Sequence, residues 1–375
     1  MKVVIFFIGF LLSLAVSSAA PSEISRLPYL QDMTSHSVVI AWRTRTAMIG
    51  EVQFSPSETS QPISQVKESQ TTRKHVIKLS NLTPFKMYRY KIFGNQAPLT
   101  DWISFKTFPE GNDAKFTFAV FGDSGTDSTH QKRIAALVAA SHPDFVLHTG
   151  DVIYDGKTDA DFDSKFFAIY GALAEHVPFF PALGNHDFDW DGGKPYLANF
   201  YLPQNSPGKG RYYSFNYAQA HFDALDSNQS LAPSSFQYKW FAHDLADSTQ
   251  PIKIVYFHHP PYSSGFHGSS LNIRASLAPL LKRYHVTLVL NGHDHDYERS
   301  KPIRGTTYVV TGGGGADLYP AFESAFTAYT QTIYDFVLCK VDGLHIHLDA
   351  INEQGKVFDQ DDLEISPLSL SSDFH

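Results

Sequence analysis

The amino-acid sequence predicts an all-β sandwich over residues 25–108, followed by an α/β domain of mixed sheets over residues 116–363. In the first part, apolar and polar residues alternate, as in SVVIAWRT with Trp42 as a core anchor, which is typical of half-buried strands. From Lys115 onward, short apolar runs alternate with stretches of helical periodicity, as in α/β domains. The chain has 375 residues, 43% of them hydrophobic, so it can bury a core in both parts.

The ends of the chain are expected to lie outside both domains. Residues 1–20 run from Lys2 through the apolar stretch VVIFFIGFLLSLAV to SSAA, the order of a secretory signal peptide cleaved near Pro21. The apolar stretch is shorter than the roughly 20 residues of a membrane-spanning helix. We therefore expect a secreted or periplasmic protein without a membrane partner. Residues 109–115 are predicted to be a linker and residues 364–375 a disordered tail.

Charge and cysteine usage narrow the function classes. The 30 basic and 38 acidic residues give a formal charge of −8, and removal of Lys2 with the signal peptide makes it −9. Such a surface repels nucleic acid, which is excluded as a partner. Cys339 is the only cysteine, so an intrachain disulfide is impossible. It lies in the alternating run TIYDFVLCKV and is predicted to be a buried thiol on a strand, with a disulfide between two chains as the alternative.

The amino-terminal domain resembles a fibronectin type III domain. The run KHVIKLSNLTPFKMYRYKIFG contains Leu82, Pro84, Tyr88 and Tyr90 in a characteristic spacing. The resemblance implies that Tyr88 forms a hydrogen bond back to the turn that precedes it.

The second domain is predicted from strands and helices that alternate along the chain. Its predicted strands are the runs FTFAVFGD, DFVLHTGD, IKIVYFHH, VTLVLNGHDH and TTYVVTGGGG, then TIYDFVLCKV and LHIHLDAINEQGKVF. Its predicted helices lie at roughly 128–141, 161–176, 235–247 and 270–284. Several strands end directly on a polar residue that could bind metal, and α/β folds place their sites at the carboxyl edge of the sheet.

Seven candidate metal ligands occur in five short motifs. They are Asp123 in GDSG, Asp151 and Tyr154 in GDVIY, Asn185 in GNHD, His258 in VYFH, and His293 and His295 in GHDH. One such motif alone is weak, because Gly-Asp and Gly-His pairs also occur in ordinary turns. The ordered set at successive strand ends indicates a single site.

The chemistry of these residues predicts a pair of metal ions. Carboxylate, phenol, amide and imidazole donors suit iron, zinc or manganese better than calcium. Two ions can hold a hydroxide and stabilise the in-line displacement at a phosphoryl group. Asp151, in the middle of the set, is the natural bridge between them. Residues two apart in an extended segment point the same way, so His293 and His295 are both expected to face the cluster.

With these motifs, residues 116–350 resemble the purple acid phosphatases of the calcineurin-like metallophosphoesterase superfamily. Many relatives in the superfamily have Asp-x-His in the first motif, whereas this chain has Gly125 there and a tyrosine in the second motif. The resemblance implies a ferric site at Asp123, Tyr154 and His295, a divalent site (zinc, iron or manganese) at Asn185, His258 and His293, and Asp151 as the bridge. The cysteines that link plant dimers are absent, so the oligomeric state is left open.

Other histidines have more than one interpretation. The resemblance makes His186 and His267 candidates to bind phosphate and protonate the leaving alkoxide. The alternatives are that His186 orients a ligand and that His267 is a surface residue. His259 is expected to face away from the site, and His345 and His347 to lie on a solvated sheet face. The run TGGGG is either an oxyanion cradle or a region of tight packing.

These observations predict a secreted acid phosphatase that hydrolyses small phosphate monoesters by attack of a metal-bound hydroxide. A nucleotide phosphodiesterase with the same metal site is the first alternative, because the motifs do not report on a second ester substituent. A binding or adhesion protein with a vestigial catalytic domain is the second.

Overall fold

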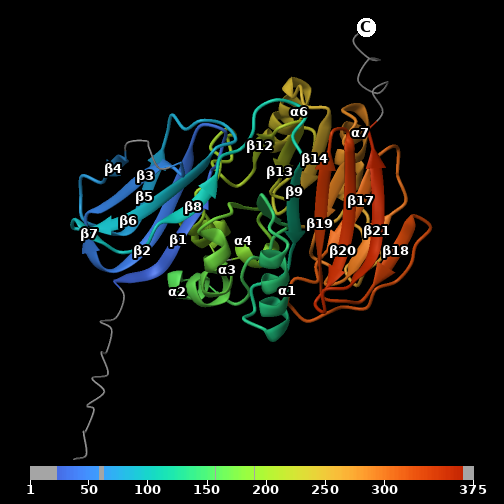
Figure 1. Cartoon of the computed structure of the whole chain (residues 1–375). Helices are drawn as coiled ribbons and strands as arrows, with labels where there is room; N and C mark the ends of the chain where they lie inside the picture. Colours follow the sequence, from blue (N-terminus) through green and yellow to red (C-terminus); the bar gives the residue numbers. More distant parts are fainter. Residues whose placement is uncertain (1–22, 59–62, 157, 190, 366–375) are drawn as a thin grey trace, which may run out of the picture.

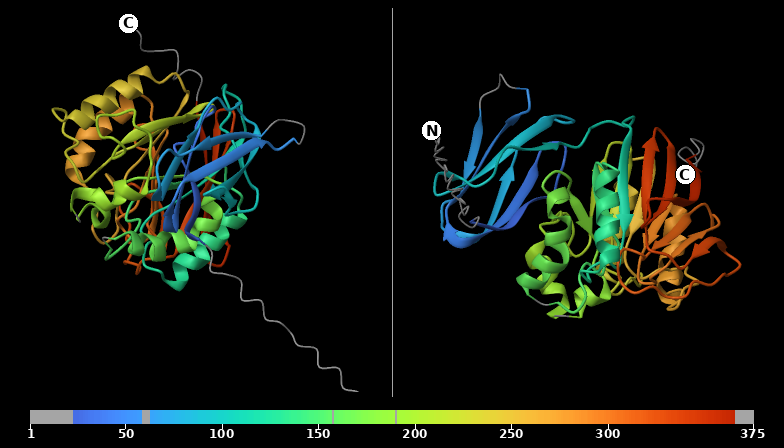
Figure 2. Two further views of the ribbon diagram at one scale, coloured as in Figure 1. Left: turned by 90° about the vertical axis from the view of Figure 1, so that its left-hand side faces the viewer. Right: turned by 60° about the horizontal axis from the view of Figure 1, so that its bottom comes forward.

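The computed structural model describes residues 23–58, 63–156, 158–189 and 191–365 of the chain. The predicted signal peptide lies outside these residues, as does the predicted tail except for Glu364 and Ile365. Within the described residues, the chain forms a sandwich beside a larger α/β domain, as predicted (Figures 1 and 2). Among the same residues, no helix is long and apolar enough to cross a membrane.

The amino-terminal domain is a sandwich of two antiparallel sheets. One sheet contains β1 (Ile24–Gln31), β2 (Val38–Met48) and β5 (Thr72–Leu79). The other contains β4 (Ser64–Lys67), β3 (Gly50–Pro56), β6 (Met87–Gly94), β7 (Ala97–Pro98) and β8 (Ile103–Lys106). Trp42 is buried between them. The backbone N–H of Thr83 donates to the hydroxyl of Tyr88 at 3.0 Å, which confirms the hydrogen bond predicted for this tyrosine.

Two mixed sheets form the centre of the α/β domain. The first sheet has the order β11 (Phe179–Pro181), β10 (Phe145–His148), β9 (Phe116–Phe121), β19 (Asp335–Asp342), β20 (His345–Asn352), β21 (Val357–Glu364). The second sheet has the order β12 (Tyr213–Tyr217), β13 (Ala220–Ala224), β14 (Ile252–Tyr256), β15 (Leu288–Asn291), β17 (Thr307–Thr311), β16 (Tyr297–Ser300), β18 (Thr327–Gln331). The predicted strands are confirmed, whereas β11, β12, β13, β16 and β18 were not predicted.

Alternation along the strands places the second sheet between two apolar layers. Ile254 of β14 and Leu288 of β15 pack into the large core that also contains Phe118 of the first sheet. Val255 and Val289, which point the opposite way, pack with the helices that cover the outer face of the second sheet. Both faces of these strands are therefore apolar, which explains their continuous apolar runs.

The predicted helices are present with adjusted bounds. They are α1 (Thr129–Ala140), α6 (Phe236–Asp247), α7 (Leu271–Arg283) and, in place of one helix over 161–176, α2 (Asp159–Phe162), a π-helical turn (Asp163–Phe167) and α3 (Ala168–Ala174). The hydroxyl of Ser128 caps α1 by accepting from the backbone N–H of Gln131. Two helices too short for periodicity to reveal, α4 (Asn185–Phe188) and α5 (Lys194–Asn199), were not predicted.

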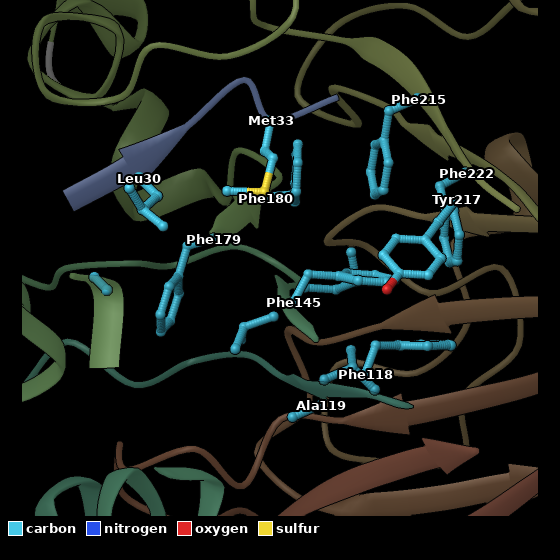
Figure 3. Close-up of a cluster of buried hydrophobic side chains, with 14 of the residues drawn as sticks. Leu30, Met33, Phe118, Ala119, Phe145, Phe179, Phe180, Phe215, Tyr217 and Phe222 are labelled. Carbon is cyan, nitrogen blue, oxygen red and sulfur yellow. The ribbon is translucent and has the colours of Figure 1, made fainter. Parts of the chain in front are cut away.

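The two domains share one apolar core. Figure 3 shows Leu30 and Met33 of the sandwich among Phe179 and Phe180 of the α/β domain. The ring of Phe108, at the end of the sandwich, lies 6.0 Å from that of Phe180. Because burial of apolar surface stabilises both partners, the sandwich and the α/β domain are expected to depend on each other for stability.

Candidate metal centre

The seven predicted ligands gather where parallel strands of both sheets end. Asp123 follows β9, and Asp151 and Tyr154 follow β10. Asn185, the first residue of α4, follows β11. His258 follows β14, and His293 and His295 follow β15. Strands β9, β10 and β11 run parallel, as do β14 and β15, so their carboxyl ends meet at one edge of the domain.

Three of the residues form a first group. The hydroxyl of Tyr154 donates to Oδ1 of Asp123 at 3.1 Å and lies 2.9 Å from Nε2 of His295. Nε2 of His295 is 3.5 Å from the same carboxylate oxygen of Asp123. These are the residues that the resemblance assigns to the ferric ion.

Three others form a second group around His258. Its Nε2 lies 2.9 Å from Oδ1 of Asn185 and 3.2 Å from Nδ1 of His293. The side chain of His258 is fully buried, and His293 is half-buried. These are the residues that the resemblance assigns to the divalent ion.

Asp151 lies between the two groups. Its Oδ2 is 3.4 Å from Nε2 of His258, and its Oδ1 accepts from the backbone N–H of His186 at 2.9 Å. Burial raises the pKa of the Tyr154 phenol, and the carboxylates of Asp123 and Asp151 raise it further, so Asp151 acts on the first group as well. Asp123, Asp151 and His258 offer donor atoms within 4.8 Å of one another.

Close approach between the turns that carry the ligands explains the glycines of the motifs. Asp123 has φ 57°, Asp151 has φ 53° and His293 has φ 73°. These tight turns bring neighbouring segments very close, so that a Cβ on Gly184 would meet Oδ1 of Asp151 at 2.0 Å. A side chain larger than hydrogen would displace the carboxylate.

The extended conformation predicted for the segment with His293 and His295 was wrong. His293 and His295 both face the cluster, but the segment that contains them is a turn and not an extended strand. The backbone N–H of His293 donates to Oδ2 of Asp123 at 2.9 Å. This bond holds the turn against the carboxylate that follows β9.

The hydrogen bonds around the histidines fit metal binding. Nδ1–H of His258 donates to the carbonyl of Thr149 at 3.1 Å, and Nδ1–H of His295 donates to the carbonyl of Asp317 at 2.6 Å. A carbonyl can only accept, so each bond leaves the lone pair of Nε2 directed into the cluster. Partners of this kind orient metal-binding histidines in proteins.

The electrostatics of the cluster also suit a cation. Burial lowers the pKa of His258, but the carboxylates of Asp151 and Asp123 outweigh it and raise the pKa to about 9. The carboxylates thus favour a positive charge next to Nε2 of His258. Burial and the neighbouring His258 lower the pKa of His293 to about 2, which keeps that imidazole neutral and able to bind metal.

The predicted catalytic histidines lie at the rim of the cluster, each beside a different donor group. The side chain of His186 is 42% exposed, and its ring packs 4.5 Å from that of Tyr154. The side chain of His267 is 35% exposed, and its ring stacks 4.2 Å from that of His293. Both can meet a substrate that approaches from solvent, whereas the side chains of Asp123 and Asp151 are buried.

The position predicted for His259 was wrong. Its ring lies 4.4 Å from that of His293, and it offers a nitrogen within 4.8 Å of donor atoms of His258 and His293. Nδ1 of His259 pairs with the hydroxyl of Ser227 at 2.8 Å. The strand has already ended at Tyr256, so alternation no longer determines which way His259 points.

Two residues of the site were missed in the sequence. Oδ1 of Asp294 accepts from the backbone N–H and the Nδ1–H of His267, at 2.7 and 3.1 Å. The charged residue between His293 and His295 was a visible signal for it. The ring of Tyr319 stacks 4.1 Å from that of His295, and no local pattern indicated this contact.

The remaining features have structural explanations. His345 and His347 lie on β20 and pair with acidic residues, as expected for a solvated sheet face. Cys339 is buried on β19 with a free thiol, as predicted. The TGGGG run is packed tightly, since a Cβ on Gly312 would meet the carbonyl oxygen of Asp294 at 2.0 Å.

One cavity borders the metal centre, and another lies apart from it. One of about 580 Å³ borders the cluster at His259 and has a mixed lining, with polar side chains such as Ser227 and Asn272 and apolar ones such as Leu231 and Ile273. Another of about 710 Å³ lies between the domains, where Ser35 and Asn216 are among its lining residues. Since the second contains none of the predicted site residues, it is separate from the metal centre.

Comparison with known proteins gives matches in both domains. The model of calcineurin-like phosphoesterases matches residues 116–297, and that of the purple acid phosphatase N-terminal domain matches residues 27–107. "Purple acid phosphatase 21" of Arabidopsis thaliana is 33% identical over 264 residues, 64% of this chain and 58% of that protein. "Acid phosphatase type 7" of Homo sapiens is 24% identical over 415 aligned positions, 95% of this chain and 93% of that protein.

A solved structure has the same fold. Purple acid phosphatase PPD1 from yellow lupin seeds superimposes with a TM-score of 0.80 and 21% identity, covering 90% of this chain and 74% of the lupin chain. The chain spans about half the length of several plant relatives that it matches, at 55%, 58% and 51% of their sequences.

Proposed function

This chain belongs to the purple acid phosphatase family of calcineurin-like phosphoesterases, and on that premise we propose that it is a binuclear metallohydrolase that removes phosphate from small phosphate monoesters. The observation that carries the proposal is the gathering of the donor side chains into two groups, with Asp151 close to Asp123 of one and His258 of the other. A fold that had lost its chemistry would not be expected to retain all seven.

The two groups differ in the ion that they suit. Asp123, Tyr154 and His295 present a carboxylate, a phenol and an imidazole, and we assign to them a ferric ion, which anionic oxygen donors favour. Asn185, His258 and His293 present neutral donors and are assigned a divalent ion, either zinc, iron or manganese. When bound, such a pair lowers the pKa of a water molecule and neutralises charge on a phosphoryl group.

His186 and His267 are proposed to act on the substrate. Both are partly exposed beside buried donors, so they lie where a phosphate ester would reach the cluster from solvent. Asp294 accepts the Nδ1 proton of His267, which leaves Nε2 to meet the ester. We assign proton transfer to the leaving alkoxide to His267 and contact with phosphate oxygens to His186.

Metal analysis and kinetics together test the function. Purified protein should contain two metal ions per chain and hydrolyse 4-nitrophenyl phosphate with a kcat/KM at least about tenfold above that for bis(4-nitrophenyl) phosphate. Asp123→Asn should abolish activity, whereas Asp127→Asn, a control at an exposed residue with a similar φ of 60°, should not.

Each alternative corresponds to a different outcome. A higher kcat/KM for the diester would favour the nucleotide phosphodiesterase. Two bound metals without hydrolysis of either ester would favour a binding protein with a vestigial site.

The role of His267 has its own test. General acid catalysis contributes about 10²–10⁴-fold, and mainly when the leaving group is poor. His267→Ala should therefore slow hydrolysis of an alkyl phosphate much more than that of 4-nitrophenyl phosphate. Equal losses on both esters would instead assign His267 to phosphate binding.

Secretion remains part of the proposal. The basic, apolar and small residues at positions 1–20 are the reason for it. Amino-terminal sequencing of protein from a secreting host should find a chain that begins near Pro21, and a retained Met1 would contradict this.

A further inference from the structure

We propose that Phe266 and Tyr319 form a binding subsite for an aromatic leaving group, so that the favoured substrates are phosphate monoesters with a ring next to the ester oxygen. This inference rests on the proposed phosphatase function and adds to it the class of alcohol that is released.

A continuous set of ring contacts connects the subsite to the metal centre. Tyr319 stacks on His295 with ring centroids 4.1 Å apart, and His267 lies 5.2 Å from Tyr319. The ring of Phe266 is 5.4 Å from that of Tyr319 and 5.3 Å from that of His267. Phe266 therefore lies beside His267, which is assigned to the leaving group, and beside Tyr319, which packs on the predicted metal ligand His295.

Phe266 is unusually exposed to solvent for a residue that contacts two other rings. Its side chain is 65% exposed, although its ring contacts those of His267 and Tyr319. Tyr319 is held in place, since its backbone N–H donates to the carbonyl of His295 at 3.0 Å. An exposed aromatic surface fixed at the rim of a polar site is available to an apolar part of a ligand.

The position of His267 relates this surface to the ester. Asp294 holds Nδ1 of His267, so Nε2 is the atom left to contact the leaving oxygen. The group attached to that oxygen must then lie next to His267. Aromatic pairs interact at centroid distances of about 4.5–7 Å, and an aryl group in that position would be within this range of Phe266.

The cavity of about 580 Å³ beside His259 offers a competing location for the alcohol. Its lining is mixed, polar and apolar, and includes His259 but neither His293 nor His267. We favour the Phe266 side because His267, the residue assigned to the leaving group, contacts Phe266 directly.

Binding of non-hydrolysable ligands tests the subsite without relying on turnover. The affinities of phenylphosphonate and methylphosphonate for the metal-loaded protein would be measured by calorimetry. The wild type should bind the phenyl compound more tightly, and Phe266→Ala should reduce this preference by about 2–10-fold, the size of one aromatic pair. Phe266→Tyr should preserve the preference.

A matched control and a second variant complete the test. Phe236, 83% exposed at the start of α6, is an exposed phenylalanine outside the ring contacts of the site, so Phe236→Ala should leave the preference unchanged. If Phe266→Ala does not fold, Phe266→Leu keeps an apolar side chain without the ring and should give the same loss of preference.

The outcomes separate the subsite from the function. An equal effect of Phe266→Ala on both phosphonates, or no effect, overturns the subsite. The same holds if the wild type has no phenyl preference while it hydrolyses 4-nitrophenyl phosphate. A wild type that binds two metals and hydrolyses neither test ester refutes the proposed function instead.

Discussion

The two sheets of the α/β domain contribute different donors to one centre. The loops after β9, β10 and β11 of the first sheet contribute oxygen donors: Asp123, Asp151, Tyr154 and Asn185. The loops after β14 and β15 of the second sheet contribute nitrogen donors: His258, His293 and His295. Each of the two donor groups takes side chains from both sheets.

The two sheets have different parts in this site, since one provides negatively charged side chains and the other provides oriented imidazoles. Among the predicted ligands, the buried carboxylates Asp123 and Asp151 come from the first sheet, and they need a compensating cation. The second sheet carries imidazoles, two of which are oriented by backbone carbonyls. Neither sheet alone offers a complete set, so the site depends on how the two sheets are packed against each other.

The largest effect is expected from the shared carboxylate of the first sheet. Asp151→Ala should remove both metals and lower kcat by at least about 10³-fold, because the cluster loses the carboxylate placed between the two groups. Metal per chain and kcat would be measured together. Asp155→Ala is the control, since Asp155 is exposed and has a similar φ of 46°. Retention of two metals by Asp151→Ala would show that the residue is not the bridge.

A smaller effect is expected from a single histidine of the second sheet. His258→Gln should lose the divalent ion only, leaving one iron per chain at Asp123, Tyr154 and His295, with activity reduced by about 10²-fold. Elemental analysis would distinguish the ions. His259→Gln should keep both metals, and the reverse pattern would make His259 the ligand.

Tyr154 provides a spectroscopic measure of the first group. A phenolate on ferric iron gives a charge-transfer band in visible light, so the oxidised protein should be pink to purple. Tyr154→Phe should lose the band and retain activity within about tenfold of wild type, provided that iron stays bound. A colourless wild type with full ferric occupancy would exclude Tyr154 as a ligand.

The smallest effect concerns a histidine of the second sheet that lies apart from the centre. Burial lowers the pKa of His221, but Asp223 and Asp244 outweigh it and raise the pKa from 6.5 to about 9. The native state then binds this proton more tightly, so the resulting stability is present below about pH 6.5 and lost as pH rises through about 9.

Denaturation at two pH values measures this contribution. The difference in unfolding free energy between wild type and His221→Gln should be larger at pH 6 than at pH 9, by on the order of 1–3 kcal/mol. An equal difference at both values would mean that the two carboxylates do not hold a proton on His221. The proximity of Asp223 and Asp244 would then not be evidence that His221 is positively charged.

Local pattern explains which elements were predicted and which were missed. Strands β9, β14 and β15 were visible because buried parallel strands are continuous apolar runs. Strands β16 and β18 were not, since they are short and partly polar and are defined by their antiparallel partners. The π-helical turn within the predicted helix at 161–176 left no signal in the apolar periodicity.

The residues of the site also divide into those that a local sequence pattern reveals and those that depend on tertiary contacts. By itself the sequence determined the kinds of donor, their order and their places at strand ends, because apolar strand runs and glycine turns depend only on neighbouring residues. Tertiary structure decided that His259 lies against His293, that Asp294 holds His267 and that Tyr319 stacks on His295. Those contacts join loops from different strands, and their geometry follows from the packing of the two sheets rather than from any local pattern.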